Sequence, residues 1–430
     1  MLSVGGATGL QAQFVWRGGG STGNIVDHFN WQSSLPGGLG VVDENVTFGT
    51  AGQTAVVINS TDLLSAFEVN KIVLHSLTFN GNGESYTFSG TGSPTLQITG
   101  DLLASCSNTV VINCSLKVQL AAGVTGDTNN VHTVDVSGNS SVQILANICG
   151  NGASLLKTGN GSLELDGNNT FDGGVEVTAG DLFVGSDTAV GSGILKLHGN
   201  TELAPSSANV SLANNITLVG DNGGVVENDD GGSNDLTLTG KICGSGSIEW
   251  CTTGTLTLAN SCNIFTGGVD MREGTLYLGS SSTFSGGVIT KGPIGTGQLT
   301  MADGTTLGVA SEAGPITLHN AIGLEEGSTV TFDTSNGNLT LKGCISGDGG
   351  IIVSGSNTLI LTAHDNYSDG TTIDRCATLQ IGDGGSHGSI TGDVTDIYPA
   401  QCIIQIESVK SVVKIPRLGL GLRALRDLRG

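Results

Sequence analysis

The sequence predicts an all-β protein, a right-handed parallel β-helix (β-solenoid) with no transmembrane helix. Three observations carry the prediction: 70 of the 430 residues are glycine and only 7 are proline, apolar residues alternate in short pairs, and one block of sequence recurs along the chain. Strands of about three to five residues cannot each build a core, but stacked coils bury each inward pair against the pairs above and below it. A β-sandwich, the competing fold, explains neither the recurrence nor such short strands.

The recurring block opens at Asn169, again at Asn263, which is 94 residues later, and more weakly at Asn366, a further 103 residues on. A similar introduction precedes each copy: Ile148-Cys149-Gly150, Ile242-Cys243-Gly244 and Ile345-Ser346-Gly347. Three matches in the same order are hard to obtain by chance. They predict three imperfect structural repeats.

Within the first two copies, apolar residues stand in pairs at alternate positions. The pairs are Leu163/Leu165, Val175/Val177, Leu182/Val184, Leu195/Leu197, Leu256/Leu258, Val269/Met271, Leu276/Leu278 and Leu299/Met301. Side chains two residues apart point to the same face of a strand, so each pair is expected inside a coil. Gly, Asn, Asp and Ser between the pairs supply turns and positive φ, and no window keeps a convincing helical period.

Composition and charge exclude several classes of protein. Glycine lacks the three-residue period of collagen, and no stretch approaches the roughly 18 apolar residues of a membrane helix. The chain carries 16 Lys and Arg against 38 Asp and Glu, a formal charge of -22, which argues against nucleic-acid binding because phosphate neutralisation needs cations. The charge is uneven, since residues 1–400 carry -26 and residues 401–430 carry +4.

Residues 156–185 resemble the autotransporter-associated β-strand repeat of bacterial passenger domains. The chain has LKTGNGSLELDGNNTFDGGV at 156–175 and AGDLFVG at 179–185, against a family pattern of approximately LTKTGAGTLTLSGANTYTGGTTV followed by AGTLQVG. Similar further elements are GDGGSHGSI at 382–390, WRGGG at 16–20, Asn30-Trp31, Pro36 and VTFG at 46–49. The resemblance covers about residues 16–50 and 148–395.

The resemblance implies an exported passenger, a β-solenoid carried to the cell surface by a C-terminal outer-membrane β-barrel. We therefore expect a non-enzymatic passenger that forms a β-solenoid stalk and acts as an adhesin. The location it implies is the cell surface, associated with the outer membrane or extracellular if the chain is exported. The expected partners are surface molecules of host or neighbouring cells, without nucleic acid and without membrane insertion by this chain. The oligomeric state is not predicted.

The sequence divides into four parts. Residues 1–12 are interpreted as a remnant of a signal peptide, with an ordinary N-terminal segment as the alternative. An N-terminal β-rich solenoid segment follows at 13–147, and the solenoid with three imperfect repeats occupies 148–396. Residues 397–430 form an atypical basic tail. Because nothing after Gly382 supplies barrel strands, we expect a truncated product without the translocator barrel and a frameshifted tail, and a genuine basic tail is the alternative.

Nine cysteines are many for such a passenger. Three pairs are close enough in sequence to form disulfides after export: Cys106/Cys114, Cys243/Cys251 and Cys251/Cys262. No spacing matches a C-x-x-C zinc site, and an odd count leaves at least one thiol unpaired. Because Cys149 and Cys243 occupy equivalent repeat positions, we favour small residues buried inside a coil over disulfides.

No catalytic, cofactor-binding or metal-binding residue is predicted. The histidines, at positions 28, 75, 132, 198, 319, 364 and 387, stand in unrelated contexts and are expected in turns or on the surface. Asp229-Asp230 and Glu325-Glu326 are expected to be solvated loops rather than calcium sites. No nucleophile elbow, P-loop or dinucleotide motif occurs. The rival hypothesis is a parallel β-helix carbohydrate-active enzyme, such as a polysaccharide lyase, although Lys and Arg are scarce in the repeats.

Overall fold

The computed structural model confirms the predicted all-β parallel solenoid, and every element of the described residues is a strand. The description covers residues 13–16, 45–48, 55–59, 71–74, 76–79, 85–91, 95–105, 109–113, 117–121, 130–220, 234–374, 376–384, 387–396, 403–406 and 424–426. The chain divides into two compact units, residues 1–195 and 196–430. Parallel pairing between coils excludes the β-sandwich. No helix able to cross a membrane occurs in these residues.

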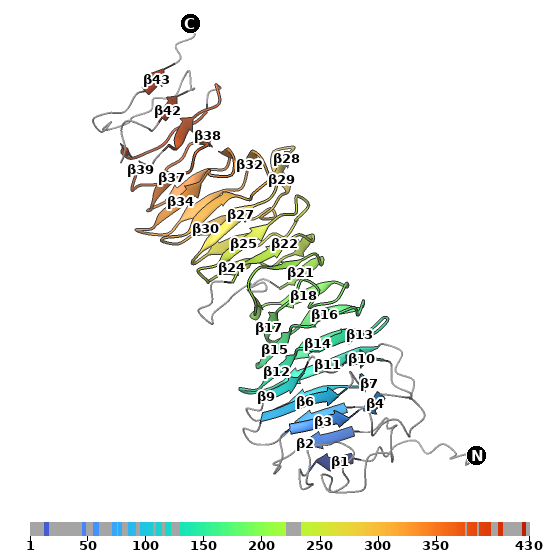
Figure 1. Ribbon diagram of the computed structural model, residues 1–430. Coiled ribbons are helices and arrows are strands. Elements are labelled where there is room, and N and C mark those ends of the chain that lie inside the picture. The colour runs from blue at the N-terminus through green and yellow to red at the C-terminus, as the bar shows by residue number, and fades with distance from the viewer. Residues whose placement is uncertain are drawn as a thin grey trace, which may run out of the picture. The chain divides into compact units, whose positions relative to one another are not determined.

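The first unit stacks its strands in three parallel sheets (Figure 1). In pairing order, the first sheet contains β1 (Gln13–Trp16), β2 (Asn45–Phe48), β5 (Ser76–Phe79), β8 (Leu102–Ala104), β11 (Val131–Val136), β14 (Ser154–Thr158) and β16 (Gly174–Val177). The second contains β4 (Lys71–Leu74), β7 (Thr95–Ile98), β10 (Lys117–Leu120) and β13 (Asn147–Cys149). The third contains β3 (Ala55–Asn59), β6 (Ser85–Thr91), β9 (Thr109–Ile112), β12 (Ser141–Ile144), β15 (Ser162–Leu165) and β17 (Gly180–Val184).

The second unit repeats this plan. Its nine-stranded sheet contains β20 (Val210–Leu212), β22 (Leu236–Leu238), β25 (Thr255–Leu258), β27 (Thr275–Leu278), β31 (Thr306–Val309), β34 (Thr329–Asp333), β37 (Gly350–Ser354), β39 (Thr371–Ile373) and β41 (Val394–Asp396). Its five-stranded sheet contains β24 (Ile248–Trp250), β26 (Val269–Met271), β30 (Leu299–Met301), β33 (Ile322–Leu324) and β36 (Ile345–Gly347). Its six-stranded sheet contains β32 (Ile316–Leu318), β35 (Leu339–Leu341), β38 (Thr358–Leu361), β40 (Thr378–Ile381), β42 (Ile403–Ile406) and β43 (Ala424–Arg426).

Six further strands complete the elements of the described residues. They are β18 (Leu195–His198), where the units meet in sequence, β19 (Thr201–Pro205), the parallel pair β21 (Ile216–Val219) and β23 (Ile242–Gly244), and the antiparallel hairpin β28 (Thr283–Ser285) and β29 (Val288–Lys291).

Successive coils keep one register along each sheet. Leu256 pairs with Leu236 of the preceding coil and with Leu276 of the following one, so a coil takes 20 residues here. Thr275 and Thr306 are also partners, although 31 residues separate them, because the β28–β29 hairpin is inserted between β27 and β31. Extra residues therefore leave the coil without disturbing the register of its strands.

The core lies inside the coils, where the paired apolar residues meet. All eight predicted pairs are buried, and none of their side chains is more than 2% exposed. Parallel pairing places identical or similar residues one rung, about 4.8 Å, apart. The prediction from period-two pairs is therefore confirmed, with strands as short as three residues.

Parts of the four-part division lie outside the described residues. These include residues 1–12, Asn30-Trp31, Pro36 and most of the tail, as well as Gly385 and Ser386 of the third copy. Within the predicted basic tail, β42 pairs in parallel with β40, and β43 pairs with β42. The boundaries of the four parts stay predictions.

Candidate functional site

Each repeat turns one corner of its coil around a buried polar side chain. In the first repeat, Asn169 accepts a hydrogen bond from the Ile148 N–H at 2.7 Å, and its amide donates to the Ala189 carbonyl. The equivalent partners of Asn263 in the second repeat are Ile242 (2.8 Å) and Pro293 (2.7 Å). Both asparagines are almost fully buried, so these bonds satisfy backbone groups that water cannot reach.

The third repeat is shifted by one residue from its predicted position. Asp365, not Asn366, accepts the hydrogen bond from the N–H of Ile345, at 2.7 Å. The N–H of Asn366 donates to the Ile345 carbonyl, as the N–H of Thr170 donates to Ile148 in the first repeat. The prediction that the third copy opens at Asn366 is therefore wrong, because Asp365 itself fills the asparagine position.

Asp365 differs from the two asparagines in its second oxygen. Its Oδ2 atom is buried and has no hydrogen-bond partner among the described residues. A carboxylate cannot donate as the asparagine amides do. Burial raises the pKa of Asp365 to about 7, against the lowering effect of the Ile345 N–H. The corner of the third repeat thus holds a carboxyl group that titrates near neutral pH.

A second inward position also changes its chemistry between repeats. Lys157, which is 0% exposed, donates through Nζ to the carbonyls of Thr158, Gly159 and Ala179 at 2.7–3.0 Å. Burial lowers its pKa to about 8, despite the opposing effects of two nearby aspartates. The structurally equivalent residues are Trp250 and Val353, which pair with β26 and β39 as Lys157 pairs with β16. Lys157 therefore holds three backbone carbonyls together inside the coil.

A charged cluster lies on the outer side of the five-stranded sheet. The Arg272 guanidinium contacts Asp270 and Glu325 at 2.6 Å each and Glu249 at 3.3 Å. The pKa of Asp270 is raised, chiefly by burial, against the lowering effect of Arg272. Glu325 is thus part of an ion-pair network, whereas we expected Glu325-Glu326 to be a solvated loop. Asp229-Asp230 lie outside the described residues.

The thiols differ from their prediction. Cys149 and Cys243 are half-exposed on the outer side of their strands, because they alternate with the buried Ile148 and Ile242. The prediction that both cysteines are buried inside a coil is therefore wrong. Cys243 and Cys262 are free thiols. Neither of the two predicted disulfides with Cys251 is therefore formed. Cys106, Cys114 and Cys402 lie outside the described residues.

Cys262 and Cys344 are free thiols in contrasting surroundings. A hydrogen bond with Ser261 and the Lys291 ammonium, whose Nζ lies 3.6 Å from the sulfur, lower the pKa of Cys262. Burial and the carboxyl of Asp365 raise the pKa of Cys344. The pKa values of the two thiols therefore shift in opposite directions, and one thiol lies near a cation whereas the other lies near a carboxyl group.

The described histidines do not gather in a single cluster. His132 is buried, contrary to the expectation of turn or surface positions, and its ring nitrogens contact the Gly100 carbonyl at 2.9 Å and the Asn130 side chain. His364 contacts Ser389, and its ring centroid is 5.9 Å from that of His387. Positions 28 and 75 are not described. In the described part of the chain, no three His, Cys, Asp or Glu side chains are placed to hold a metal ion.

An inserted hairpin is the first surface feature that breaks the coil pattern. Gly286 and Gly287 have φ of 61° and 87°, the positive values that a two-residue turn of type I′ requires. The side chains of Phe284 and Val288 are 50% and 61% exposed. The Phe284 ring stacks on His319, with centroids 5.1 Å apart and planes 4° apart. Sequence reasoning missed this hairpin, although Gly-Gly between two short β-prone runs is its signal.

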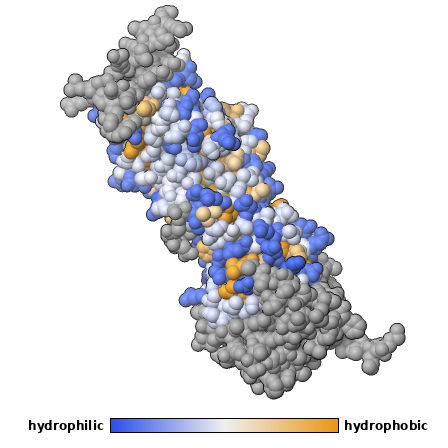
Figure 2. All heavy atoms as spheres, viewed as in Figure 1, coloured by the Kyte–Doolittle hydropathy of each residue, from blue (hydrophilic) through white to orange (hydrophobic). Residues whose placement is uncertain are grey.

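The second feature is the outer face of the nine-stranded sheet, where polar side chains form columns. Thr255, Thr275, Thr306 and Thr331 are successive partners in one column. The neighbouring column contains, in order, Ser211, Thr237, Thr257, Tyr277, Gly308, Asp333 and Ser354. Figure 2 shows broad areas of near-neutral hydropathy on the described surface, in keeping with such hydroxyl rows.

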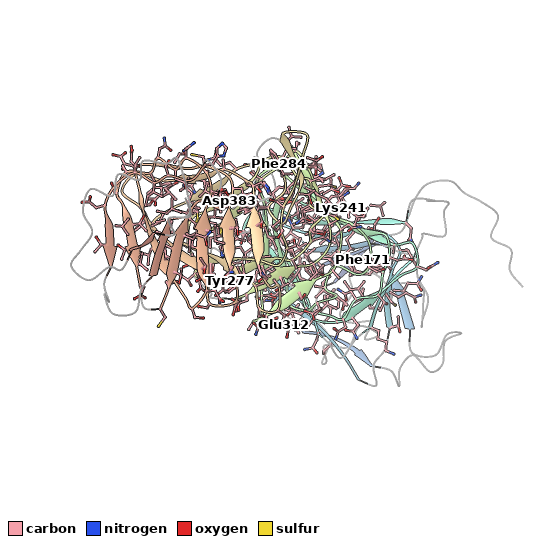
Figure 3. All side chains as sticks on the ribbon, turned by 90° about the horizontal axis from the view of Figure 1, so that it is seen from above. Phe171, Lys241, Tyr277, Phe284, Glu312 and Asp383 are labelled. Carbon is pink, nitrogen blue, oxygen red and sulfur yellow. The ribbon has the colours of Figure 1, made fainter. Side chains whose placement is uncertain are left out.

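Tyr277 is the aromatic residue of this face. A Cβ built on its partner Gly308 would lie 2.6 Å from Cε1 of Tyr277, so the ring lies over the bare glycine. The hydroxyl donates to Oδ2 of Asp333 at 3.3 Å. Burial raises the pKa of Tyr277, with a further contribution from Asp333. In Figure 3, Tyr277 and Phe284 lie on opposite edges of the second unit.

Comparison with known proteins identifies the repeats. The passenger-associated-transport-repeat family matches residues 155–182 and 351–381, which contain the first and third repeats. A relative, the adhesin BmaC autotransporter of Brucella suis biovar 1 (strain 1330), is 33% identical over 207 residues, which is 46% of this chain and 6% of the relative. The chain thus spans only a small part of the length of the relative it matches. No solved structure matches the chain.

Proposed function

The chain carries the repeats of autotransporter passengers, and from this premise we propose that it is a non-enzymatic, surface-exposed passenger segment that acts in adhesion. The observation that carries the proposal is the position of the repeats. Each matched segment forms complete coils with buried inward pairs, so the repeat sequence is used to extend a solenoid. A solenoid of this kind holds its outer faces and insertions in fixed positions, which suits contact with another surface.

The location is tested on the bacterium that produces the chain. Antibodies raised against the purified full chain should label intact cells. The same antibodies should label permeabilised cells no more strongly, and an antibody to a cytoplasmic protein should label only the permeabilised cells. Labelling that requires permeabilisation would overturn the proposed location.

Adhesion is tested with the purified full chain coupled to fluorescent beads. These beads should bind cultured host cells more strongly than beads that carry serum albumin or the urea-unfolded chain. Equal binding by folded and unfolded chain would show that the solenoid surface is not responsible, and it would remove the adhesin proposal.

The rival function is a β-helix polysaccharide lyase, which needs a cation free to act on the substrate, and two cations of the described residues are engaged with other groups. The buried Lys157 is fastened to three carbonyls, and Arg272 is surrounded by three carboxylates. Neither cation is placed to stabilise charge on a substrate. Incubation of the full chain with pectate and other acidic polysaccharides in the presence of calcium should give no unsaturated product, whereas clear turnover would replace our proposal by the rival.

A further inference from the structure

The outer face of the nine-stranded sheet combines three features that proteins use for sugars. Its two columns of outward side chains run across the stacked coils, with one residue per rung. Neighbouring rungs of a sheet are about 4.8 Å apart, so the hydroxyls form straight, regular rows. Thr255, Thr275, Thr306 and Thr331 are all half-exposed, which leaves their hydroxyls able to donate and accept hydrogen bonds.

The aromatic ring of Tyr277 provides a flat apolar area within the second row. Because Gly308 has no side chain, the ring lies down on the next coil instead of standing out from the sheet. Gly308 is buried as a result, although it faces outward, and Tyr277 itself stays half-exposed. The hydrogen bond to Asp333 ties the far end of the ring to the coil beyond. The ring is thus held in one orientation before any ligand arrives, which lowers the entropic cost of binding.

Carboxylates stand at both ends of this area. Asp333 accepts the hydrogen bond of Tyr277 and those of the Ser335 N–H and hydroxyl. Asp235 accepts the N–H of Thr255 at 2.8 Å, and its charge reaches Tyr277, whose pKa it helps to raise. Acidic groups accept hydrogen bonds from sugar hydroxyls, and they repel sialic acid, uronic acid and sulfate groups.

We propose that this face binds an uncharged glycan chain, with one sugar ring stacked on Tyr277 and its hydroxyls bonded to the flanking threonine and aspartate side chains. The apolar C–H face of a sugar matches a fixed aromatic ring, and the hydroxyls at its edge match rows of short polar groups. The regular rows continue over several coils, which suits an oligosaccharide better than a single sugar. Charge complementarity selects a neutral chain.

The inference deepens the proposed adhesion by naming the chemistry of the partner. Its biological role rests on the proposed function, whereas the binding itself is tested separately. Binding is measured with the purified full chain on immobilised neutral oligosaccharides of N-acetyllactosamine, beside sialylated and sulfated forms of the same chains. We expect binding to the neutral forms and at least about tenfold weaker binding to the acidic forms.

Three substitutions test the role of the ring. Tyr277→Ala should weaken binding by about tenfold or more, as removal of a central aromatic contact does. Tyr277→Phe keeps the ring and should retain most of the binding. Gly308→Ala leaves the tyrosine in place but puts a methyl group where the ring lies, so it should weaken binding nearly as much as Tyr277→Ala.

A matched control is Phe284→Ala, which removes an exposed aromatic ring from the hairpin on another edge of the unit. It should not change glycan binding. Circular dichroism and thermal unfolding of each variant show whether the solenoid is intact, and Tyr277→Phe keeps the test open if Gly308→Ala fails to fold.

The outcomes separate the inference from the proposed function. Bead adhesion without binding to any glycan, or with binding unchanged in Tyr277→Ala, would overturn the glycan site and leave adhesion standing. Stronger binding to the sialylated or sulfated chains would also overturn it. Loss of adhesion in Tyr277→Ala without any glycan binding would assign the face to a protein partner, against our proposal. Glycan binding without cell adhesion would support the site and count against the adhesin.

Discussion

The repeats at 155–182 and 351–381 follow the same coil path with opposite buried chemistry. In the first, the inward position holds Lys157 and the corner holds the neutral Asn169. In the other, the inward position holds Val353 and the corner holds Asp365. The hydrogen bonds to the backbone at the corner are the same, 2.7 Å from Ile148 and from Ile345.

This difference shows what the coil requires and what it leaves open. The corner needs an acceptor for one buried N–H, and either an amide or a carboxyl oxygen supplies it. The second inward position tolerates side chains of different size and charge, because it holds lysine, tryptophan and valine in the three repeats. Geometry is therefore conserved through the backbone bonds, while each repeat carries a different electrostatic cost.

The largest effect on stability is expected from removal of the Asn169 side chain at the corner of the first repeat. Asn169→Ala leaves the Ile148 N–H and the Ala189 carbonyl buried without partners, and each such group costs roughly 1–3 kcal/mol. We expect the first unit to lose about 4 kcal/mol of unfolding free energy. Urea unfolding measures the loss, and hydrogen exchange should localise it to the coils around Ile148.

The matched control is the adjacent Asn168→Ala, which removes an exposed side chain. It should change the unfolding free energy by less than about 0.5 kcal/mol. Similar losses in both variants would mean that the corner bonds do not determine the stability of the coil.

The acidic corner should make stability depend on pH. The Asp365 carboxyl titrates near 3.8 in the unfolded chain and near 7 when folded, so the folded state binds more protons between those values. Stability therefore falls as pH rises from about 4 to about 7, and the penalty is complete above pH 7. Asp365→Asn should remove this fall and stabilise the second unit by about 4 kcal/mol at pH 8, with little effect at pH 4.

Urea unfolding at a series of pH values tests this, followed by the fluorescence of Trp250, which is buried in the same unit. The titratable neighbours Tyr367 and Cys344 both have raised pKa values and stay protonated through this window. The exposed Asp369→Asn is the control and should keep the wild-type slope. A slope unchanged in Asp365→Asn would refute the assignment.

The buried Lys157 of the first repeat should also make stability depend on pH, but in the alkaline range and with the opposite sign. Its pKa is about 8 when folded and 10.5 when unfolded, so the unfolded state binds more protons and stability rises between those values. Lys157→Met should abolish this rise. At pH 7 we expect a loss of about 1–2 kcal/mol, because three carbonyls lose their donor while the cost of burying a charge disappears.

The exposed Lys117→Met provides the comparison for that variant. Its unfolding free energy between pH 7 and 10.5 should follow that of the wild type. If both variants keep the rise in unfolding free energy with pH, a group other than Lys157 causes it.

The smallest effect concerns reaction rates and leaves stability unchanged. Cys262, with its lowered pKa, should react with iodoacetamide several-fold faster at pH 8 than Cys344, whose pKa is raised. Asp365→Asn should speed up Cys344 and leave Cys262 unchanged, because it removes the negative charge near one thiol only. Mass spectrometry of the labelled peptides measures both rates in one sample, and an unchanged ratio would contradict the local charge difference.

Sequence periodicity was sufficient for the fold, because a buried pair such as Leu256 and Leu258 leaves an unambiguous alternate pattern. It was insufficient for the third corner, where an Asp-Asn pair hides which residue turns inward. It was also insufficient for Cys149 and Cys243, since small residues fit either side of a strand. Tyr277 could not be found because its place depends on Gly308, which is 31 residues away and becomes its neighbour only through the coil register.

The hairpin between β27 and β31 has a consequence for how such chains change over time. Its residues leave the coil after one rung and return in phase for the next, as the partnership of Thr275 and Thr306 shows. The length and composition of the excursion are thereby uncoupled from the folding of the scaffold. Residues of the excursion can be exchanged while every buried rung stays the same, so variation in an inserted segment and constancy of the scaffold are compatible in one polypeptide.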